Sequence, residues 1–262
     1  MNRPPRIAIS MGDPAGVGPE LCLRLCGEEA PDFGAELTII GSEKVLRDVA
    51  LATGLEFGGA CIDFGPVEGL IPGEISEHTG AASHRYLVDA IDATMAGRFD
   101  AIVTCPINKE ALSLAGIPHP GHTEILVERS GAKQHCMMLT SAEITCSLVT
   151  THCSIAEVPG LLTTARILEV IELSAEVMGR LRDRAPRLGV LGLNPHAGEH
   201  GLFGDEEAEI IRPAMDAAAA KGIEVRGPLP PDTAFRPSMR EHIDAYICMY
   251  HDQGLIPLKT LA

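Results

Sequence analysis

The chain has 262 residues, a length that fits one large domain or two domains of moderate size. A hydrophobic fraction of 45% with 22% charged residues is typical of a soluble globular protein and excludes wholesale disorder. With 36 acidic against 21 basic side chains, the net charge of −15 argues against a surface that binds nucleic acid or an anionic membrane.

Signals for targeting are few. No apolar run approaches the roughly 18 to 20 residues that cross a bilayer, and the N-terminal stretch MNRPPRIAIS lacks the long apolar segment of a secretion signal. The eight cysteines are scattered without CxxC pairs, so we expect reduced thiols, most of them in the core. These features predict a cytoplasmic protein.

Apolar strands and helical segments alternate in the first part of the chain. We expect strands at 6–11, 36–41 and 100–104, a glycine-rich turn at 12–18, and helices from about Pro19, after the cap Ser42 and over 82–96. This alternation predicts crossover units and a largely parallel sheet with helices on both faces, which is an α/β architecture.

The later part of the chain begins with an expected antiparallel hairpin, formed by 136–140 and 145–150 around a short polar turn. After the hairpin we expect a helix at 164–184, a strand at 188–193, a helix at 205–220 and a strand at 245–250. The loop 115–121, rich in proline and glycine, is the best domain boundary. We therefore predict one α/β lobe at 1–115 and a second at 116–262.

Three histidines share one kind of position. His152, His196 and His251 each follow the carboxyl end of an apolar strand, the edge at which open α/β sheets bind ligands. Three imidazoles with an open fourth position form a typical catalytic site for zinc or a similar divalent ion. The alternative, left open by spacing alone, is that each is an ordinary loop histidine.

Four further polar residues are candidate site residues, and three of them have a second interpretation. Asp252 is a carboxylate that supports His251 or acts as an extra ligand, or it is a helix N-cap. His122 and Thr123 offer a ring nitrogen and a hydroxyl to a small polar substrate, although Thr123 can also cap a helix over 124–129. Lys259 supplies a positive charge for an anionic substrate, or is simply solvated. The turn GDPAGVGPE does not match the dinucleotide pattern GxGxxG, so we interpret it as a strand-to-helix turn near the substrate cleft and assign it no nucleotide role on this pattern.

Seven segments then follow in order from Met11 to Lys259: MGDPAGVGPE, TCPINKEAL, PGHTE, VTTH, GLNPHAGE, GPLPPDT and MYHDQGLIPLK. Together they closely resemble the 4-hydroxythreonine-4-phosphate dehydrogenase family of pyridoxine biosynthesis. The resemblance implies an isocitrate/isopropylmalate dehydrogenase-like fold, with two α/β/α lobes, a cleft between them, and a homodimer with shared active sites. It also implies oxidation of 4-phosphohydroxy-L-threonine by NAD or NADP, followed by loss of CO2.

The resemblance also implies roles for individual residues. His152, His196 and His251 match ligands of a divalent ion (zinc, cobalt, nickel or magnesium) in a site shared across the dimer. His122, Thr123 and Lys259 match substrate contacts, and Asp232 and Asp252 are candidate catalytic carboxylates near them. Residues 161–178 are apolar over much of a helical circumference, so we expect this helix at the dimer interface unless it is a central core helix.

The resemblance leaves two matters open. Family members continue past Ala262 through a segment with further substrate contacts and much of the NAD site, so no cofactor-binding residues are predicted here. Related enzymes act on 4-phospho-threonate, 4-phospho-erythronate or a terephthalate dihydrodiol, and the seven segments do not separate these substrates. A non-catalytic module that binds metal and phosphate is the alternative from another functional class.

Overall fold

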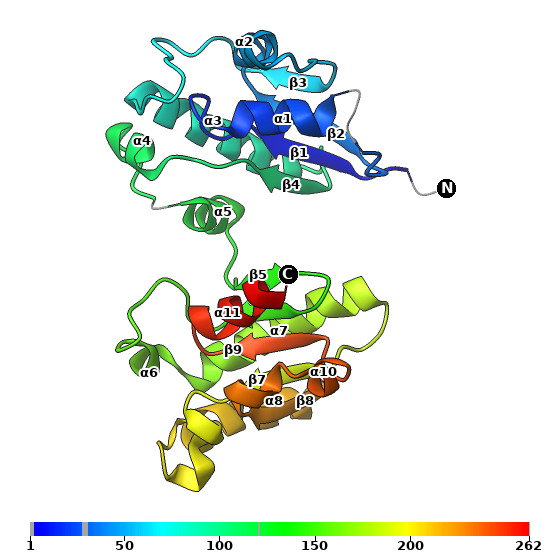
Figure 1. The fold of residues 1–262 in the computed structure, drawn as a ribbon, viewed down its shortest axis with the longest axis vertical. Coiled ribbons are helices and arrows are strands. Elements are labelled where there is room, and N and C mark those ends of the chain that lie inside the picture. Colours follow the sequence, from blue (N-terminus) through cyan, green and yellow to red (C-terminus); the bar gives the residue numbers. More distant parts are fainter. Residues whose placement is uncertain (1–2, 28–30, 120, 262) are drawn as a thin grey trace. The chain divides into compact units, whose positions relative to one another are not determined.

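The computed structural model describes residues 3–27, 31–119 and 121–261, and the chain divides into two compact units (Figure 1). The N-terminal unit is Met1–Lys133 and the C-terminal unit is Gln134–Ala262. Each unit has its own sheet and hydrophobic core, as expected for a two-lobe α/β protein.

The division lies later in the chain than the boundary predicted at 115/116. Helices α4 (Lys109–Leu114) and α5 (His122–Ser130) both pack against α3 (Glu77–Met95). The buried side chain of Ile125 on α5 joins the same apolar cluster as Leu87 and Leu112. Because this core continues through α5, the segment 116–133 belongs to the N-terminal unit. The loop 115–121, rich in proline and glycine, interrupts the helices locally and does not separate the two units.

The N-terminal unit contains a parallel sheet in the order β3-β2-β1-β4. Its strands are β1 (Arg6–Ser10), β2 (Glu36–Gly41), β3 (Ala60–Asp63) and β4 (Ala101–Thr104). The helices α1 (Gly18–Cys26) and α2 (Glu43–Thr53) connect them, together with α3. The predicted cap is confirmed, since the Ser42 hydroxyl accepts a hydrogen bond from the Val45 amide at 3.3 Å.

The C-terminal unit contains a mixed sheet in the order β5-β6-β9-β7-β8. Strands β5 (Met137–Thr140) and β6 (Thr145–Leu148) form the predicted antiparallel hairpin. Strands β7 (Leu188–Leu191), β8 (Val225–Leu229) and β9 (Ala245–Cys248) complete the sheet in parallel pairings. Sequence patterns miss β8 because glycine and proline interrupt this edge strand.

The helices of the C-terminal unit differ in length and regularity. The long ones are α7 (Thr164–Arg182), α8 (Arg212–Ala220) and α11 (His251–Leu261). Three single turns, α6 (Val158–Leu161), α9 (Pro231–Ala234) and α10 (Pro237–Arg240), link other elements. The helix predicted at 205–220 begins instead with a π-helical turn, η2 (Glu207–Ile211), before α8.

Helix α7 is a core helix of its own unit. Ile167, Val170 and Ile171 are fully buried in one cluster with residues of β7, β9 and α8. Val177 and Leu181 remain as exposed large apolar side chains on this helix. The apolar pattern over 161–178 is therefore explained by the core, and it gives no separate reason to place a dimer interface on α7.

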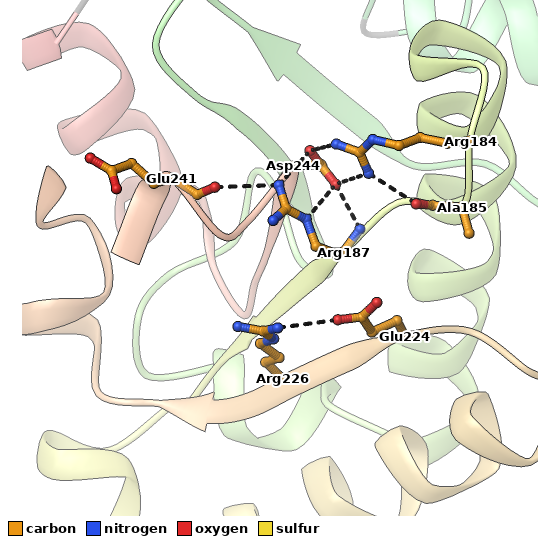
Figure 2. A network of polar contacts seen from close by, with 7 residues as sticks. All are labelled: Arg184, Ala185, Arg187, Glu224, Arg226, Glu241 and Asp244. Atoms are coloured by element: carbon orange, nitrogen blue, oxygen red, sulfur yellow. Dashed lines mark hydrogen bonds and ion pairs between the residues drawn. The ribbon is translucent and has the colours of Figure 1, made fainter. Parts of the chain in front are cut away.

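A buried carboxylate fixes the starts of the two central strands of the C-terminal unit (Figure 2). Asp244, just before β9, accepts hydrogen bonds from the Arg187 amide at 2.8 Å and from both Nη atoms of Arg184 at 2.8 and 2.6 Å. Burial alone raises the pKa of Asp244, but the two arginines outweigh burial and hold that pKa well below its usual value. This network lies at the opposite strand ends from the predicted histidine site.

The cysteines and the helix lengths complete the description of the fold. All eight cysteines are free thiols, four of them buried and four partly buried. In the described parts of the chain, no helix is both long and apolar enough to span a bilayer.

Candidate active site

The three strand-end histidines follow three neighbouring strands of the C-terminal sheet. Strand β9 pairs in parallel with β6 on one side and with β7 on the other. His152, His251 and His196 follow β6, β9 and β7, respectively. Because parallel strands end at a common edge, all three loops leave the sheet on the same side.

Two of these histidines lie together. The ring centroids of His152 and His251 are 5.7 Å apart. Both rings line a pocket of about 220 Å³, whose wall also includes Tyr250 and Asp252. The geometry therefore brings two imidazoles to one solvent-accessible point at the carboxyl edge of the sheet.

Asp252 supports the ring of His251. Helix α11 begins at His251 itself, so Asp252 lies in the first turn and is not the N-cap. The Asp252 Oδ1 atom is 2.7 Å from His251 Nδ1. A carboxylate accepts this hydrogen bond, so Nδ1 carries the proton and Nε2 keeps its lone pair for a metal ion.

His196 does not join this pair within one chain. It lies exposed on η1 (Pro195–Gly201), where its ring is 6.2 Å from that of Phe203. Over the described residues, no group of three or more His, Cys, Asp or Glu side chains is placed to hold a metal ion. Imidazole nitrogens are suitable ligands for a divalent ion, so the three histidines fit such a site by their chemistry. Within one chain, however, only His152 and His251 lie together.

The other predicted residues of the C-terminal unit lie on two helices. Asp232 is exposed on α9, a helical turn that packs against η1 and thus near the loop of His196. Lys259 is exposed in the last turn of α11, the helix that begins with His251. Neither residue forms an ion pair with the part of the chain that the structure describes.

The N-terminal unit carries His122 and Thr123 at the start of α5. Gly121 is the N-cap, so the capping role considered for Thr123 is wrong. The exposed Thr123 hydroxyl forms no hydrogen bond with the residues that the structure describes. His122 Nε2 donates a hydrogen bond to the Cys105 carbonyl at 3.2 Å, because a carbonyl oxygen only accepts. The Nδ1 atom of a neutral ring is then left as an acceptor for a substrate hydroxyl or amino group.

The glycine-rich turn after β1 contacts the same carbonyl. Gly12 has a φ of +71°, and a Cβ atom there would lie 2.7 Å from the Cys105 oxygen and 2.3 Å from that of Pro106. Only glycine permits this approach. The turn therefore positions the 105–106 backbone that holds His122, a role that the sequence pattern alone did not reveal.

The pKa of His122 is lowered, because burial disfavours the charged ring more than the Cys105 carbonyl favours it. Since the folded pKa lies below the unfolded value of about 6.5, the ring stays neutral until the pH falls through that lowered value. NMR titration, with His122→Gln to assign the signal, should give a midpoint below about 6.5 and an Nε2–H tautomer. A higher midpoint or an Nδ1–H tautomer would contradict this arrangement.

These features define a two-unit α/β protein with a pair of imidazoles at the carboxyl edge of one sheet, and comparison with known proteins gives its family. Residues 35–262 match the family described as Pyridoxal phosphate biosynthetic protein PdxA. The chain belongs to this family, which confirms the resemblance found in the sequence, and it is an oxidoreductase.

Individual relatives agree with this assignment. The chain is 43% identical to a 4-hydroxythreonine-4-phosphate dehydrogenase of Desulfosudis oleivorans, covering 100% of this chain and 83% of that protein. It is 38% identical to a D-threonate 4-phosphate dehydrogenase of Salmonella typhimurium, covering 97% and 84% of the two chains. A crystal structure of 4-hydroxythreonine-4-phosphate dehydrogenase from Klebsiella pneumoniae matches with a TM-score of 0.91 at 38% identity, over 99% of this chain and 84% of that one. The α/β fold is thereby confirmed.

Proposed function

We propose that this protein oxidises 4-phosphohydroxy-L-threonine with NAD in a reaction that requires a divalent metal ion. The observation that carries the proposal is the pair His152–His251, with its Asp252 support, at the carboxyl edge of the sheet in a member of this family. The name of the 43% identical relative supports the choice of substrate.

The proposed reaction has two steps. Hydride leaves C3 of the substrate for NAD+ while the C3 hydroxyl loses its proton, so that the alcohol becomes a ketone and the nicotinamide is reduced. The new ketone is β to the carboxylate, so the C1–C2 bond can break with release of CO2. The resulting enolate takes a proton at C2, which gives 3-amino-1-hydroxyacetone phosphate.

We assign the candidate residues of each unit a role in this reaction. His152, His196 and His251 would hold the divalent ion, and Asp252 would keep His251 in the metal-binding tautomer. A divalent ion bound there supplies positive charge that stabilises negative charge on the substrate oxygen. In the N-terminal unit, His122 and Thr123 would contact the substrate. Lys259 would bind the anionic substrate through its positive charge, and Asp232, beside the His196 loop, is a candidate catalytic carboxylate.

Because one chain gathers only two of the three imidazoles, we propose that a homodimer completes the site. Analytical ultracentrifugation should give twice the chain mass at micromolar concentration. A mixture of His152→Ala and His196→Ala chains should regain metal binding in mixed dimers, since one intact set of ligands can form across the interface. A monomeric protein with a full complement of metal would contradict the shared site.

D-Threonate 4-phosphate is the second candidate substrate, because a relative acting on it is 38% identical to this chain. Initial rates of NADH formation should be compared for 4-phosphohydroxy-L-threonine, D-threonate 4-phosphate, D-erythronate 4-phosphate and terephthalate dihydrodiol, with NADP+ as the alternative cofactor. We expect kcat/KM for the first substrate to exceed the others by about 10⁴-fold, because a site that hydrogen-bonds the substrate amino group rejects analogues that lack it. A preference for D-threonate 4-phosphate would replace the proposed substrate. Metal binding without turnover of any compound would favour a non-catalytic binding module.

A further inference from the structure

A buried carboxylate holds the loop that carries His196. Glu207, the first residue of η2, is only 4% exposed. It forms no ion pair with a lysine, arginine or histidine of the described residues. A carboxylate buried without a cation is costly unless neutral donors satisfy its oxygens. The sequence pattern places Glu207 in the helix predicted at 205–220 and gives no sign of this environment.

The donors to Glu207 all come from the segment just before His196. Its Oε1 atom accepts hydrogen bonds from the backbone amides of Leu193 and Asn194, each at 2.8 Å. Its Oε2 atom accepts a third from Asn194 Nδ2 at 3.0 Å. The carboxylate also fills the concave side of the loop, since a Cβ atom on Gly198 would lie 2.6 Å from Oε2.

The loop itself needs such support. His196, Ala197, Glu199 and His200 have φ values between 41° and 59°, in the left-handed region. This conformation costs L-residues on the order of 1–2 kcal/mol each, and it persists only where surrounding contacts fix it. A second buried side chain, Gln253, holds the start of the loop by donating a hydrogen bond to the Gly192 carbonyl at 2.7 Å.

We propose that Glu207 is a positioning residue for His196, which it holds through the amides of Leu193 and Asn194. The inference rests on the proposed role of His196 as a metal ligand. In this role Glu207 acts through the loop and needs no contact of its own with the metal or the substrate. It fixes the strained loop so that the imidazole is already in place when the ion binds, which lowers the ordering cost of binding.

The chemistry of the cluster suggests the variant Glu207→Gln, which keeps the shape of the side chain. A glutamine oxygen can still accept from the two backbone amides, but its NH2 group then faces the Asn194 NH2 group. The Asn194 side-chain amide cannot flip to relieve this clash without losing a hydrogen bond, because its Nδ2 also donates to Glu206 Oε2 at 2.7 Å. Glu206→Gln is the matched control, since Glu206 lies next in sequence and, among the described residues, accepts a hydrogen bond from the Asn194 side chain and from no backbone amide.

Two measurements test the proposal on the whole protein. In metal-free protein, amide hydrogen exchange at Leu193 and Asn194 should be faster in Glu207→Gln by about tenfold, the loss expected for one buried hydrogen-bond interaction. In a Co2+ titration, the affinity should fall by about 10- to 100-fold, and the visible absorption of the saturated complex should change with the ligand geometry. Glu206→Gln should match the wild type in both measurements.

The outcomes separate this inference from the proposed function. Wild-type exchange and Co2+ binding in Glu207→Gln, together with loss of Co2+ binding in His196→Ala, would overturn the role of Glu207 alone. Unchanged Co2+ binding in His196→Ala would overturn the metal assignment and, with it, the role of Glu207. If Glu207→Gln does not fold, Asn194→Ala removes one of the three hydrogen bonds and should produce the same effects at smaller size. Wild-type behaviour of Asn194→Ala would then count against the proposal.

Discussion

Replacement of His251 by alanine should lower the affinity for Zn2+ or Co2+ by at least about 100-fold, because loss of a ligand nitrogen is seldom compensated. In the Asp252→Asn variant the affinity for the same ions should fall by about tenfold, because the His251 ring then lacks the carboxylate that fixes its tautomer. Metal content after dialysis and isothermal titration of metal-free protein would measure both effects.

The exposed His242 provides the control for this prediction. It lies before β9, away from the carboxyl edge of the sheet, so His242→Ala should bind metal like the wild type. An unchanged metal content in His251→Ala would contradict the proposed ligand set. An equal loss in His242→Ala would show that the change in content reflects general damage to the fold.

Replacement of Asp244 by alanine should lower the free energy of unfolding by about 2–3 kcal/mol. Removing one partner of a buried ion pair costs about 3–5 kcal/mol, and we reduce this figure because the Arg184 and Arg187 side chains are 47% and 29% exposed. Urea denaturation followed by circular dichroism would measure the difference. Glu224→Gln is the control, because the Glu224–Arg226 pair is about half exposed and should contribute less than about 0.5 kcal/mol (Figure 2).

The stability contributed by Asp244 should depend on pH in a definite direction. The folded pKa of Asp244 lies below its unfolded value of about 3.9. Its stabilising contribution is therefore fully present above that value and is lost as the pH falls toward the folded pKa. The gap in unfolding free energy between wild type and Asp244→Asn should be constant from pH 7 to about pH 5 and shrink below about pH 4. A gap that stays constant down to pH 3 would contradict it.

Local sequence signals predicted most of the strands and the strand-end positions of the histidines, but missed β3 and β8. The strand at 36–41, the cap Ser42 and the hairpin after residue 136 depend on short patterns of apolar and polar residues. His152 and His251 lie together because the carboxyl ends of β6 and β9 are neighbours, which follows from a parallel α/β arrangement.

Features that depend on contacts distant in sequence were beyond these signals. The boundary at Lys133 depends on α5 packing against α3, which a break in local pattern cannot reveal. The apolar surface of α7 looks the same in sequence whether it faces a core or a partner subunit. Glu207 resembles a surface residue until the Leu193 and Asn194 amides are seen around it.

The balance between NADH formed and CO2 released tests the proposed reaction most directly. With NAD+, a divalent ion and 4-phosphohydroxy-L-threonine labelled with 13C at the carboxylate, we expect one labelled CO2 and one 3-amino-1-hydroxyacetone phosphate for each NADH. His251→Ala should yield neither product. NADH formed without CO2 would contradict the decarboxylation, and CO2 or ketone formed without NADH would contradict oxidation by hydride transfer.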